Sequence, residues 1–427
     1  MSTSLFHPEI CPLFTVRRSL LAIFTLFSFL VSPLFSQVKT GADLLLTKYR
    51  ALVAGKHVGL ITNQTGRLSD GRFLADVLHK DPDVTLAALF GPEHGIRGAA
   101  PAGERQSDNV DSATGVTAYS LYGRIYKPTP EMLKGIDLLL FDIQDVGARF
   151  YTYISTLSYA MEAAAEQGIP FVVLDRPNPI RGTWVEGFGR EDSLRSFVGL
   201  QPIPIVHGMT VGELATLFNN EGWLAGGIHA NLTVVKMEGW KRDMWYDQTG
   251  LPWVPPSPNI PTIESAVVYP GMCLVEGTNL SEGRGTAKPF EYISAPYVDG
   301  NKLAAELNGE RLPGVRFEPI MVTPVSIPGA STNPKYKGER CGGVFVHVTD
   351  RNVYEPVRTG VCLIAAARKL YPQEFRWRSH RGIDRLAGTA LFREGIDDGW
   401  SPERIVGLWK TVVERFRTLR TASLLYP

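Results

Sequence analysis

Beyond residue 50 the sequence alternates short apolar runs with amphipathic helical patterns, and this alternation limits the possible folds more than any other feature. Continuous apolar strands that alternate with helices are typical of a parallel sheet that helices cover on both faces. The pattern therefore predicts an α/β protein built around a Rossmann-like parallel sheet. The runs with the length of buried strands lie near residues 57–63, 85–90, 137–142, 171–175 and 231–237.

Three helices of this predicted domain have recognisable ends. Thr210 and Glu213 have the spacing of a capping box, so we expect a helix to begin after Thr210. Asp70 is expected to cap an earlier helix. A third helix is expected at about residues 152–167, closed by Gly168.

A proline-rich stretch at residues 251–261, LPWVPPSPNIP, interrupts the alternation. It fits neither a helix nor a central strand. We therefore expect a Rossmann-like catalytic domain at 37–262 and a smaller α+β domain at 263–427, with an interdomain cleft. In the second part we expect strands near 315–324 and 343–348, and helices near 356–370 and 402–419.

The N-terminus has the pattern of a secretory signal peptide. Arg17 and Arg18 precede an apolar run at residues 20–31, and small residues follow. The run is shorter than the roughly 20 apolar residues that a membrane span requires. We expect residues 1–36 to be removed, which leaves a periplasmic or secreted protein without a membrane span. An uncleaved anchor is the alternative.

Overall charge and short motifs exclude several classes of protein. The 44 Lys and Arg residues nearly balance the 43 Asp and Glu residues, and the net charge is +1. This balance disfavours bulk electrostatic binding to nucleic acid or to an anionic membrane. A P-loop, GxGxxG, HExxH or GxSxG motif in a convincing context is also missing. Nucleotide enzymes, zinc proteases and serine hydrolases are therefore disfavoured.

The cysteines predict neither a disulfide framework nor a zinc site. Cys11 precedes the apolar run and would be lost with the signal peptide. The three that remain, Cys273, Cys341 and Cys362, show no CxxC spacing. We expect buried free thiols, and we expect no metal or cofactor.

Each predicted strand is followed by a polar segment, and these segments are where chemistry is expected. Ligands of open parallel sheets bind beyond the carboxyl ends of the strands. Four separate loops should therefore converge at one edge of the sheet. They are residues 62–64 (TNQ), 91–94 (GPEH), 142–145 (DIQD) and 175–179 (DRPNP).

Carboxylates in two of these loops are candidates for acid–base chemistry. Glu93, with His94 beside it and Arg97 behind it, is a candidate general acid. The alternative is a loop carboxylate that holds Arg97. Asp142 and Asp145 form a possible pair for activating water or binding a metal. Alternatively, one caps the next helix and the other pairs with an arginine.

Further polar residues are candidates for substrate contacts. His207 precedes a predicted helix, although a lone histidine is more often structural. The densest polar cluster is residues 276–286, which form either a flexible surface loop or one wall of the expected cleft. The remaining candidates are Asn63, Gln144, Arg176, Asn178, Glu186, Glu276, Asn279, Glu282 and Arg284.

Several of these segments together resemble one family, the bacterial exo-β-N-acetylmuramidases of glycoside hydrolase family 171. The resemblance covers nearly the whole chain after the signal peptide, in order, and the set is more specific than any one segment. The matching segments are residues 59–66 (GLITNQTG), 90–98 (FGPEHGIRG), 141–149 (FDIQDVGAR), 175–179 (DRPNP), 207–210 (HGMT), 256–261 (PSPNIP) and 276–286 (EGTNLSEGRGT).

The resemblance implies a Rossmann-like first domain, a smaller second domain and a cleft between them. It implies release of terminal N-acetylmuramic acid from the non-reducing end of peptidoglycan fragments, which would be the partners of the protein in cell-wall turnover. It also points to the Glu93 position as catalytic. The oligomeric state stays open.

That substrate suggests roles for the candidates. Its lactyl carboxylate would require a cation, for which Arg97, Arg176 and Arg284 are available. Its acetamido group is a possible internal nucleophile, with Glu93 protonating the leaving oxygen. Asp142, Glu186 or Glu282 would orient the acetamide or activate water. A muropeptide-binding protein without activity is the main alternative. An esterase or amidase would need an activated nucleophile, for which no elbow motif is present.

Overall fold

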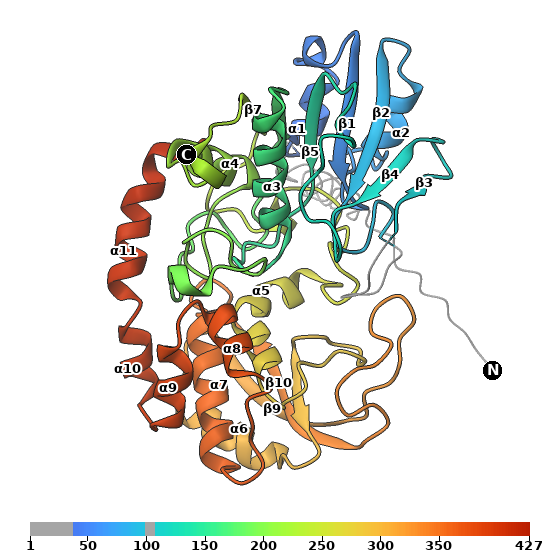
Figure 1. Cartoon of the computed structure of the whole chain (residues 1–427). Helices are drawn as coiled ribbons and strands as arrows, with labels where there is room; N and C mark the ends of the chain where they lie inside the picture. Colours follow the sequence, from blue (N-terminus) through green and yellow to red (C-terminus); the bar gives the residue numbers. More distant parts are fainter. Residues whose placement is uncertain (1–36, 99–106) are drawn as a thin grey trace, which may run out of the picture. The chain divides into compact units, whose positions relative to one another are not determined.

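Seven strands form one sheet in the order β3-β4-β2-β1-β5-β6-β7, which places the first strand at its centre (Figure 1). Neighbouring strands are parallel except for β3 with β4. The predicted parallel sheet is therefore confirmed, with a short antiparallel strand added at one edge. The strands are β1 Lys56–Thr62, β2 Val84–Gly91, β3 Asn109–Val110, β4 Thr117–Ser120, β5 Leu138–Asp142, β6 Phe171–Leu174 and β7 Leu232–Val235.

The computed structural model describes residues 37–98 and 107–427. Residues 37–427 belong to one compact unit. The predicted signal peptide, residues 1–36, and Cys11 lie outside the described residues. Among the described helices, none is both long and apolar enough to cross a membrane. The three remaining cysteines, Cys273, Cys341 and Cys362, are buried free thiols.

Helices cover both faces of the sheet, as the continuous apolar strands predict. Along β5, Leu138 and Leu140 pack into one apolar cluster with α1 and α2, while Leu139 and Phe141 pack into another with α3 and α4. This alternation follows from the two-residue period of a strand, whose side chains point to opposite faces. The helices are α1 Gly41–Leu45, α2 Leu74–Lys80, α3 Tyr153–Glu166 and α4 Val211–Asn220.

Two helix starts test the capping predictions. The capping box at Thr210 is confirmed, because its side chain accepts from the Glu213 amide and the Glu213 side chain accepts from the Thr210 amide. The predicted cap at Asp70 is wrong, since α2 begins after Phe73. The Asp70 carboxylate instead accepts hydrogen bonds from the backbone and side chain of Arg72, at 3.0 and 2.8 Å. The charged guanidinium of Arg72 is a stronger hydrogen-bond partner for the Asp70 carboxylate than the backbone amides at the start of a helix.

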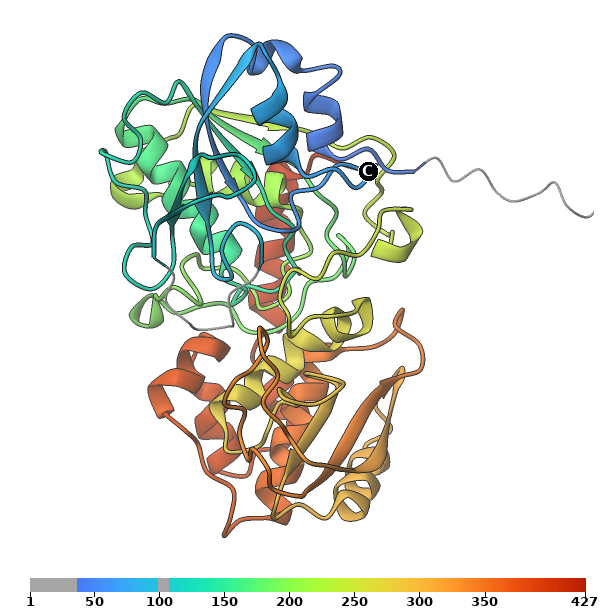
Figure 2. The ribbon, with the colours of Figure 1, turned by 90° about the vertical axis from the view of Figure 1, so that its right-hand side faces the viewer.

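The second part of the chain is smaller and mixed in structure, as predicted. Its three strands form an antiparallel sheet in the order β8-β10-β9, packed with helices (Figure 2). One apolar cluster runs from the α3 face of the large sheet into this part. Its elements are α5 Ile263–Met272, β8 Tyr292–Ala295, α6 Gly300–Gly309, β9 Val315–Val322, β10 Cys341–Val348, α7 Pro356–Leu370, α8 His380–Ala387, α9 Leu391–Asp397, α10 Pro402–Gly407 and α11 Lys410–Leu419.

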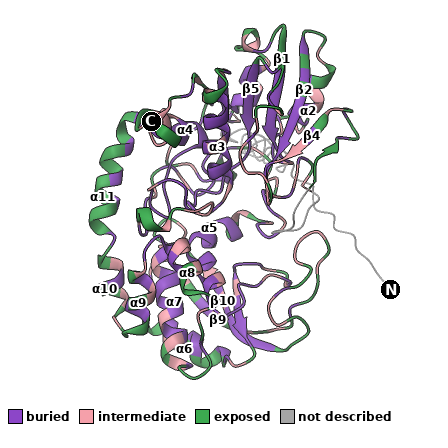
Figure 3. Cartoon of the chain, viewed as in Figure 1, coloured by how far each residue is buried: buried purple, intermediate pink, exposed green. Residues whose placement is uncertain are grey.

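The long C-terminal helix predicted at 402–419 is two helices, α10 and α11, that meet near Gly407. Glycine lowers helix stability, which gives a reason for the break at this place. Most of α11 is exposed, with Val413 and Phe416 buried (Figure 3). The short 3-10 turn η6, Arg420–Ser423, follows and brings the end of the chain back to α4. The end of the chain therefore contacts α4, in the part of the chain that contains the large sheet.

Candidate active site

The strand order of the large sheet reverses between β1 and β5. Strands β2 and β4 lie on one side of this point, and β6 and β7 lie on the other. Thr62 at the end of β1 is paired with Asp142 at the end of β5, so both strands end at the same level. The loops that leave them diverge and create the usual ligand position of an open α/β sheet.

Hydrogen bonds join the loops after β1, β5 and β6. The Asn63 side-chain oxygen accepts from the amide and hydroxyl of Thr65, at 3.0 and 2.6 Å. The Thr65 hydroxyl in turn accepts from the Gln144 amide at 2.9 Å. The side-chain NH2 of Gln144 donates to the Pro177 carbonyl at 2.7 Å. Asn63 and Gln144 therefore belong to one buried network at the end of the sheet.

The proline-rich stretch is fixed to the same loops. Gln64 donates from its side chain to the carbonyls of Pro255 and Pro256, at 3.0 and 3.1 Å. The Tyr153 hydroxyl, at the start of α3, donates to the Pro256 carbonyl at 2.6 Å. The stretch therefore packs against the carboxyl end of the sheet, in the chain segment that leads to the second part.

Glu93 lies in a tight turn at the end of β2. The amide of Gly95 donates to the Pro92 carbonyl at 3.0 Å, and His94 adopts a φ of 73°. A positive φ is unfavourable for a residue with a side chain, and such strain gathers at functional sites. His94 is buried, while Glu93 is half-buried. The turn therefore presents the Glu93 carboxyl at the surface of the site and turns His94 inward.

Three tyrosines surround Glu93. Burial raises the pKa of Tyr122, and the charge of Glu93 and a hydrogen bond to it raise this pKa further. Burial also raises the pKa values of Tyr151 and Tyr153, and the Glu93 charge adds to both shifts. Of the three, only Tyr122 has a pKa that both the charge of Glu93 and a hydrogen bond to it raise. Sequence reasoning missed all three tyrosines, because nothing in their spacing relates them to Glu93.

Arg284 approaches the same tyrosine from the second part of the chain. Its positive charge lowers the pKa of Tyr122, against the effect of Glu93. The guanidinium binds Glu276 at 2.8 Å and Glu282 at 3.3 Å. The loop at 276–286, predicted as either a flexible segment or a wall of a cleft, thus places a cation within electrostatic range of the Glu93 site.

Lys335 organises this loop. Its ammonium group lies 2.9 Å from the Glu282 carboxylate and donates to the carbonyls of Thr278 and Leu280 at 2.9 and 2.7 Å. Although burial works to raise the pKa of Glu282, the charges of Lys335 and Arg284 hold it below its usual value. Glu282 is therefore a buried, ionised carboxylate between two half-buried cations. Sequence reasoning also missed Lys335.

Asp145 and His207 form a second polar pair near the tyrosines. The two side chains approach to 3.4 Å between Asp145 Oδ2 and His207 Nε2. His207 Nδ1 accepts from the Met209 amide at 3.2 Å, which assigns the proton of a neutral imidazole to Nε2, facing Asp145. The Asp145 charge also raises the pKa of Tyr153. Within residues 37–98 and 107–427, Asp145 Oδ1 is buried without a hydrogen bond.

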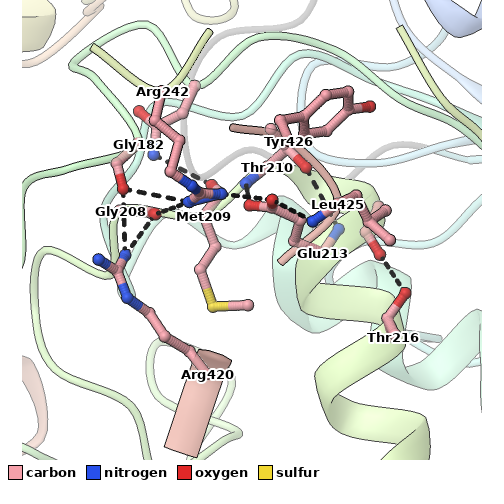
Figure 4. Close-up of polar contacts among 12 residues, drawn as sticks. Gly182, Gly208, Met209, Thr210, Glu213, Thr216, Arg242, Arg420, Leu425 and Tyr426 are labelled. Atoms are coloured by element: carbon pink, nitrogen blue, oxygen red, sulfur yellow. Dashed lines mark hydrogen bonds and ion pairs between the residues drawn. The ribbon is translucent and has the colours of Figure 1, made fainter. Parts of the chain in front are cut away.

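The backbone of the His207 loop is held by the C-terminal segment (Figure 4). Arg420 donates to the carbonyls of Gly182 and His207, at 3.1 and 3.0 Å, and also to the carbonyl of Gly208. Gly208 has a φ of 59°, and a Cβ atom there would lie 2.1 Å from the Trp184 carbonyl oxygen. The loop therefore requires glycine at this position.

Two candidates from the sequence pair with each other. The Arg176 guanidinium binds both oxygens of Asp142, at 2.6 and 2.9 Å, and both side chains are buried. Asn178 is also buried, and it donates to the Met209 carbonyl and accepts from the Ile180 amide, both at 3.0 Å. These contacts stabilise the loops after β5 and β6 and occupy the groups that would bind a substrate.

Three other candidates are held by contacts that involve neither Glu93 nor the three tyrosines around it. Arg97 binds Asp111 and Asp76, with shortest distances of 2.8 and 2.7 Å. The Glu186 carboxylate accepts from the Arg358 amide at 2.7 Å, at the start of α7. Asn279 donates from its side chain to the Glu374 carbonyl at 2.9 Å and accepts from the hydroxyl of Tyr297 at 2.8 Å. Each of these groups has a protein partner.

Comparisons with known proteins agree on one family. Sequence models of exo-β-N-acetylmuramidase NamZ match residues 58–264 for the N-terminal part and 267–426 for the C-terminal part. The peptidoglycan β-N-acetylmuramidase NamZ of Bacillus subtilis (strain 168) is 51% identical over 390 residues, which are 91% of this chain and 92% of that protein.

Solved structures show the same relationship. Two crystal structures of DUF1343 family proteins from Bacteroides fragilis NCTC 9343 superpose on this chain with TM-scores of 0.84 and 0.76. They are 41% and 35% identical in sequence, and each match covers 92% of this chain and 99% of the other. The chain therefore belongs to the exo-β-N-acetylmuramidase NamZ family.

Proposed function

We propose that the chain is an exo-acting glycoside hydrolase that releases terminal β-N-acetylmuramic acid from the non-reducing end of peptidoglycan fragments in cell-wall turnover. Family membership and the activity of the Bacillus subtilis relative, a peptidoglycan β-N-acetylmuramidase, support the reaction class. The observation that carries the proposal within this chain is the half-buried Glu93 carboxyl, hydrogen-bonded to Tyr122 and within range of the Arg284 charge.

In this proposal Glu93 is the general acid. Its proton passes to the glycosidic oxygen as the bond from that oxygen to C1 of the muramic acid breaks. The acetamido oxygen of the same sugar bonds to C1 and closes a positively charged oxazolinium ring that keeps its N–H proton. Water then adds to C1, reopens the acetamide and returns a proton to the Glu93 carboxylate. A site of this kind requires one protonated acid and one group that orients the acetamide.

Arg284 is the proposed partner of the lactyl carboxylate. A guanidinium matches a carboxylate with two parallel hydrogen bonds. Of its two present partners, Glu276 is the more exposed, at 31% of its side-chain area against 6% for Glu282. A substrate carboxylate would replace Glu276 while Glu282 and Lys335 keep the guanidinium in place.

Asp145 is the proposed second group. Asp145 Oδ1 accepts no hydrogen bond from residues 37–98 and 107–427, and Asp145 lies close enough for its charge to act on Tyr153, so Oδ1 is suited to accept a hydrogen bond from the acetamide N–H. The Gly147 amide donates to the other oxygen, Oδ2, at 2.7 Å and holds the carboxylate in place. The three carboxylates first considered for this role, Asp142, Glu186 and Glu282, are engaged elsewhere, with Arg176, with the start of α7 and with Lys335.

The location of the protein is part of the proposal. Removal of residues 1–36 as a signal peptide would leave a periplasmic or secreted enzyme, in the compartment where peptidoglycan fragments arise. The terminal sugar would bind between the carboxyl end of the large sheet and the loop at 276–286, in an interdomain cleft. N-terminal sequencing of the protein from the culture medium or periplasm would test the predicted cleavage.

Two substrates test the role of Glu93. A nitrophenolate leaves without a proton, whereas the sugar of a muramic-acid disaccharide must be protonated as it leaves. Glu93→Gln should therefore lose about 100-fold or more of kcat on the disaccharide and distinctly less on a nitrophenyl β-N-acetylmuramide. Glu221→Gln, an exposed carboxylate after α4, is the matched control and should keep full activity. Full activity of Glu93→Gln on both substrates would refute the assignment.

Product analysis distinguishes the enzyme from a binding protein. NMR of a reaction with a defined muramic-acid disaccharide reports cleavage, the end that is attacked and the anomer formed. Binding of the disaccharide without any release of muramic acid would support a muropeptide-binding protein instead.

A further inference from the structure

Four aromatic rings form a group beside Glu93, and we call this group the aromatic platform. It consists of Tyr122, Tyr126, Tyr159 and Phe197. The ring centres of Tyr126 and Phe197 lie 4.3 Å apart, and Tyr122 lies 6.1 Å from each of them. Tyr159 lies 6.3 Å from Phe197, with the two ring planes within 9° of each other.

The platform is not part of the hydrophobic core. All four rings are half-buried. None of them belongs to the apolar clusters of the described chain or to the partly buried side chains packed against those clusters. Rings that are neither core nor fully exposed are typical of a surface that binds an amphipathic ligand.

Three separate chain segments bring the rings together. Tyr122 and Tyr126 follow β4, and Tyr159 lies on α3. Phe197 lies at the tip of a tight turn in which the amides of Ser196 and Gly199 donate to each other's carbonyls, at 3.2 and 3.0 Å. The Ser155 hydroxyl donates to the Phe197 carbonyl at 2.7 Å and fixes this turn to α3. The turn therefore holds the Phe197 ring in a defined position.

The platform begins at the proposed acid. Gly91 at the end of β2 is paired with Ser120 at the end of β4, and its carbonyl accepts from the Leu121 amide at 2.8 Å, so Glu93 and Tyr122 each follow the same end of two paired strands. Tyr122 is the first ring of the platform, and the other rings follow from it. A general acid lies beside the oxygen that it protonates, on the side of the leaving group. The rings therefore lie where the leaving part of the substrate would extend.

We propose that the aromatic platform binds the sugar on the reducing side of the broken bond, an N-acetylhexosamine or a longer saccharide that begins with one. The faces of aromatic rings carry partial negative charge, and the C–H groups on one face of a sugar ring carry partial positive charge, so the two stack. An exo-acting enzyme must enclose the terminal sugar but leave room for the saccharide chain on the reducing side of the broken bond. Half-exposed rings can contact that chain without closing the site around it. This proposal rests on the proposed function.

The test compares two substrates that differ only in the leaving group. The first is a disaccharide of β-N-acetylmuramic acid and N-acetylglucosamine, and the second is β-N-acetylmuramyl fluoride, whose leaving group carries no sugar. Phe197→Leu and Tyr126→Leu should each lower kcat/KM for the disaccharide about 10-fold and change that for the fluoride less than about 2-fold. Phe197→Tyr, which keeps the ring, should restore the disaccharide reaction.

A control and a second measurement complete the test. Tyr49→Leu replaces a tyrosine that is 41% exposed, outside the platform, and should leave both reactions unchanged. Free N-acetylglucosamine should inhibit the wild type on the fluoride more strongly than it inhibits Phe197→Leu. Equal losses on both substrates, or no loss on either, would overturn the platform as a leaving-group site. Inactivity of the wild type on both substrates would instead refute the proposed function itself.

Discussion

The carbonyl oxygen of His207 accepts a hydrogen bond of 3.0 Å from Nη1 of Arg420, which lies 213 residues later in the chain. Burial lowers the pKa of Arg420 to about 10, and the charge of Arg242 lowers it as well. A buried guanidinium at this position pairs with backbone carbonyls rather than with a carboxylate. The last turn of the chain thus supports the loop whose histidine faces Asp145.

Arg420→Met should destabilise the protein. The variant keeps most of the side-chain volume but leaves the carbonyls of Gly182, His207 and Gly208 without this donor, at a cost of about 2–3 kcal/mol. Urea unfolding followed by tryptophan fluorescence measures the loss. Arg417→Met, an exposed arginine on α11, should change the unfolding free energy by no more than about 0.5 kcal/mol. Equal effects of the two variants would contradict a role for the Arg420 contacts.

Asp142→Asn should be more costly. It leaves the buried Arg176 guanidinium without its ion pair, and breaking a buried pair costs about 3–5 kcal/mol. The double variant Asp142→Leu with Arg176→Met removes both charges and should recover part of that loss. Chemical unfolding of all three proteins tests the prediction. A double variant that is less stable than Asp142→Asn would contradict the prediction, because removing both charges would then cost more than leaving one of them unpaired.

Glu186 should make stability fall as pH rises. Burial raises the pKa of Glu186 from 4.5 to about 8, and this outweighs the backbone amides of Arg358 and Val357, which lower it. Folding therefore favours the protonated carboxyl. The contribution is fully present below pH 4.5 and is lost between pH 4.5 and about 8, at up to about 1.4 kcal/mol per pH unit.

Unfolding at pH 5, 7 and 9 measures this effect. Glu186→Gln stays neutral, so its stability relative to the wild type should rise from pH 5 to about pH 8 and then level off. Glu355→Gln replaces a carboxyl at the same helix start whose side chain is 43% exposed, and it should follow the wild type. Parallel pH curves for wild type and Glu186→Gln would show that the carboxyl is ionised in the folded protein at every pH tested.

Lys335→Met should impair the substrate site more than the fold. The carbonyls of Thr278 and Leu280 lose their donor, and Glu282 loses one of the two cations that keep its pKa low. We expect Arg284 to be displaced and kcat/KM on a nitrophenyl β-N-acetylmuramide to fall about 10-fold, mostly through KM. Lys337→Met, an exposed lysine two residues later, should match the wild type. A loss confined to kcat would argue against a role in binding.

Much of the fold followed from local pattern. The apolar runs of the large sheet, the Thr210 capping box and α7 appear at or near the predicted residues. Two of the missed elements lack such a pattern: β3 has two residues, and α5 carries Pro270 within it. For the site, the position of the loops at the strand ends identified the loops, but it did not distinguish Asp142, which pairs with Arg176, from Asp145, whose Oδ1 has no hydrogen bond within the described part of the chain.

The sequence by itself determined the alternation of strands and helices, the polar ends of the strands and the family, because these depend on neighbouring residues and on segments kept in order. Only the tertiary structure decided which polar groups meet: Tyr122 with Glu93, Lys335 with Glu282, and Arg420 with the His207 carbonyl. The physical reason is that a buried polar group must find a partner wherever packing brings one, and packing joins residues far apart in the chain.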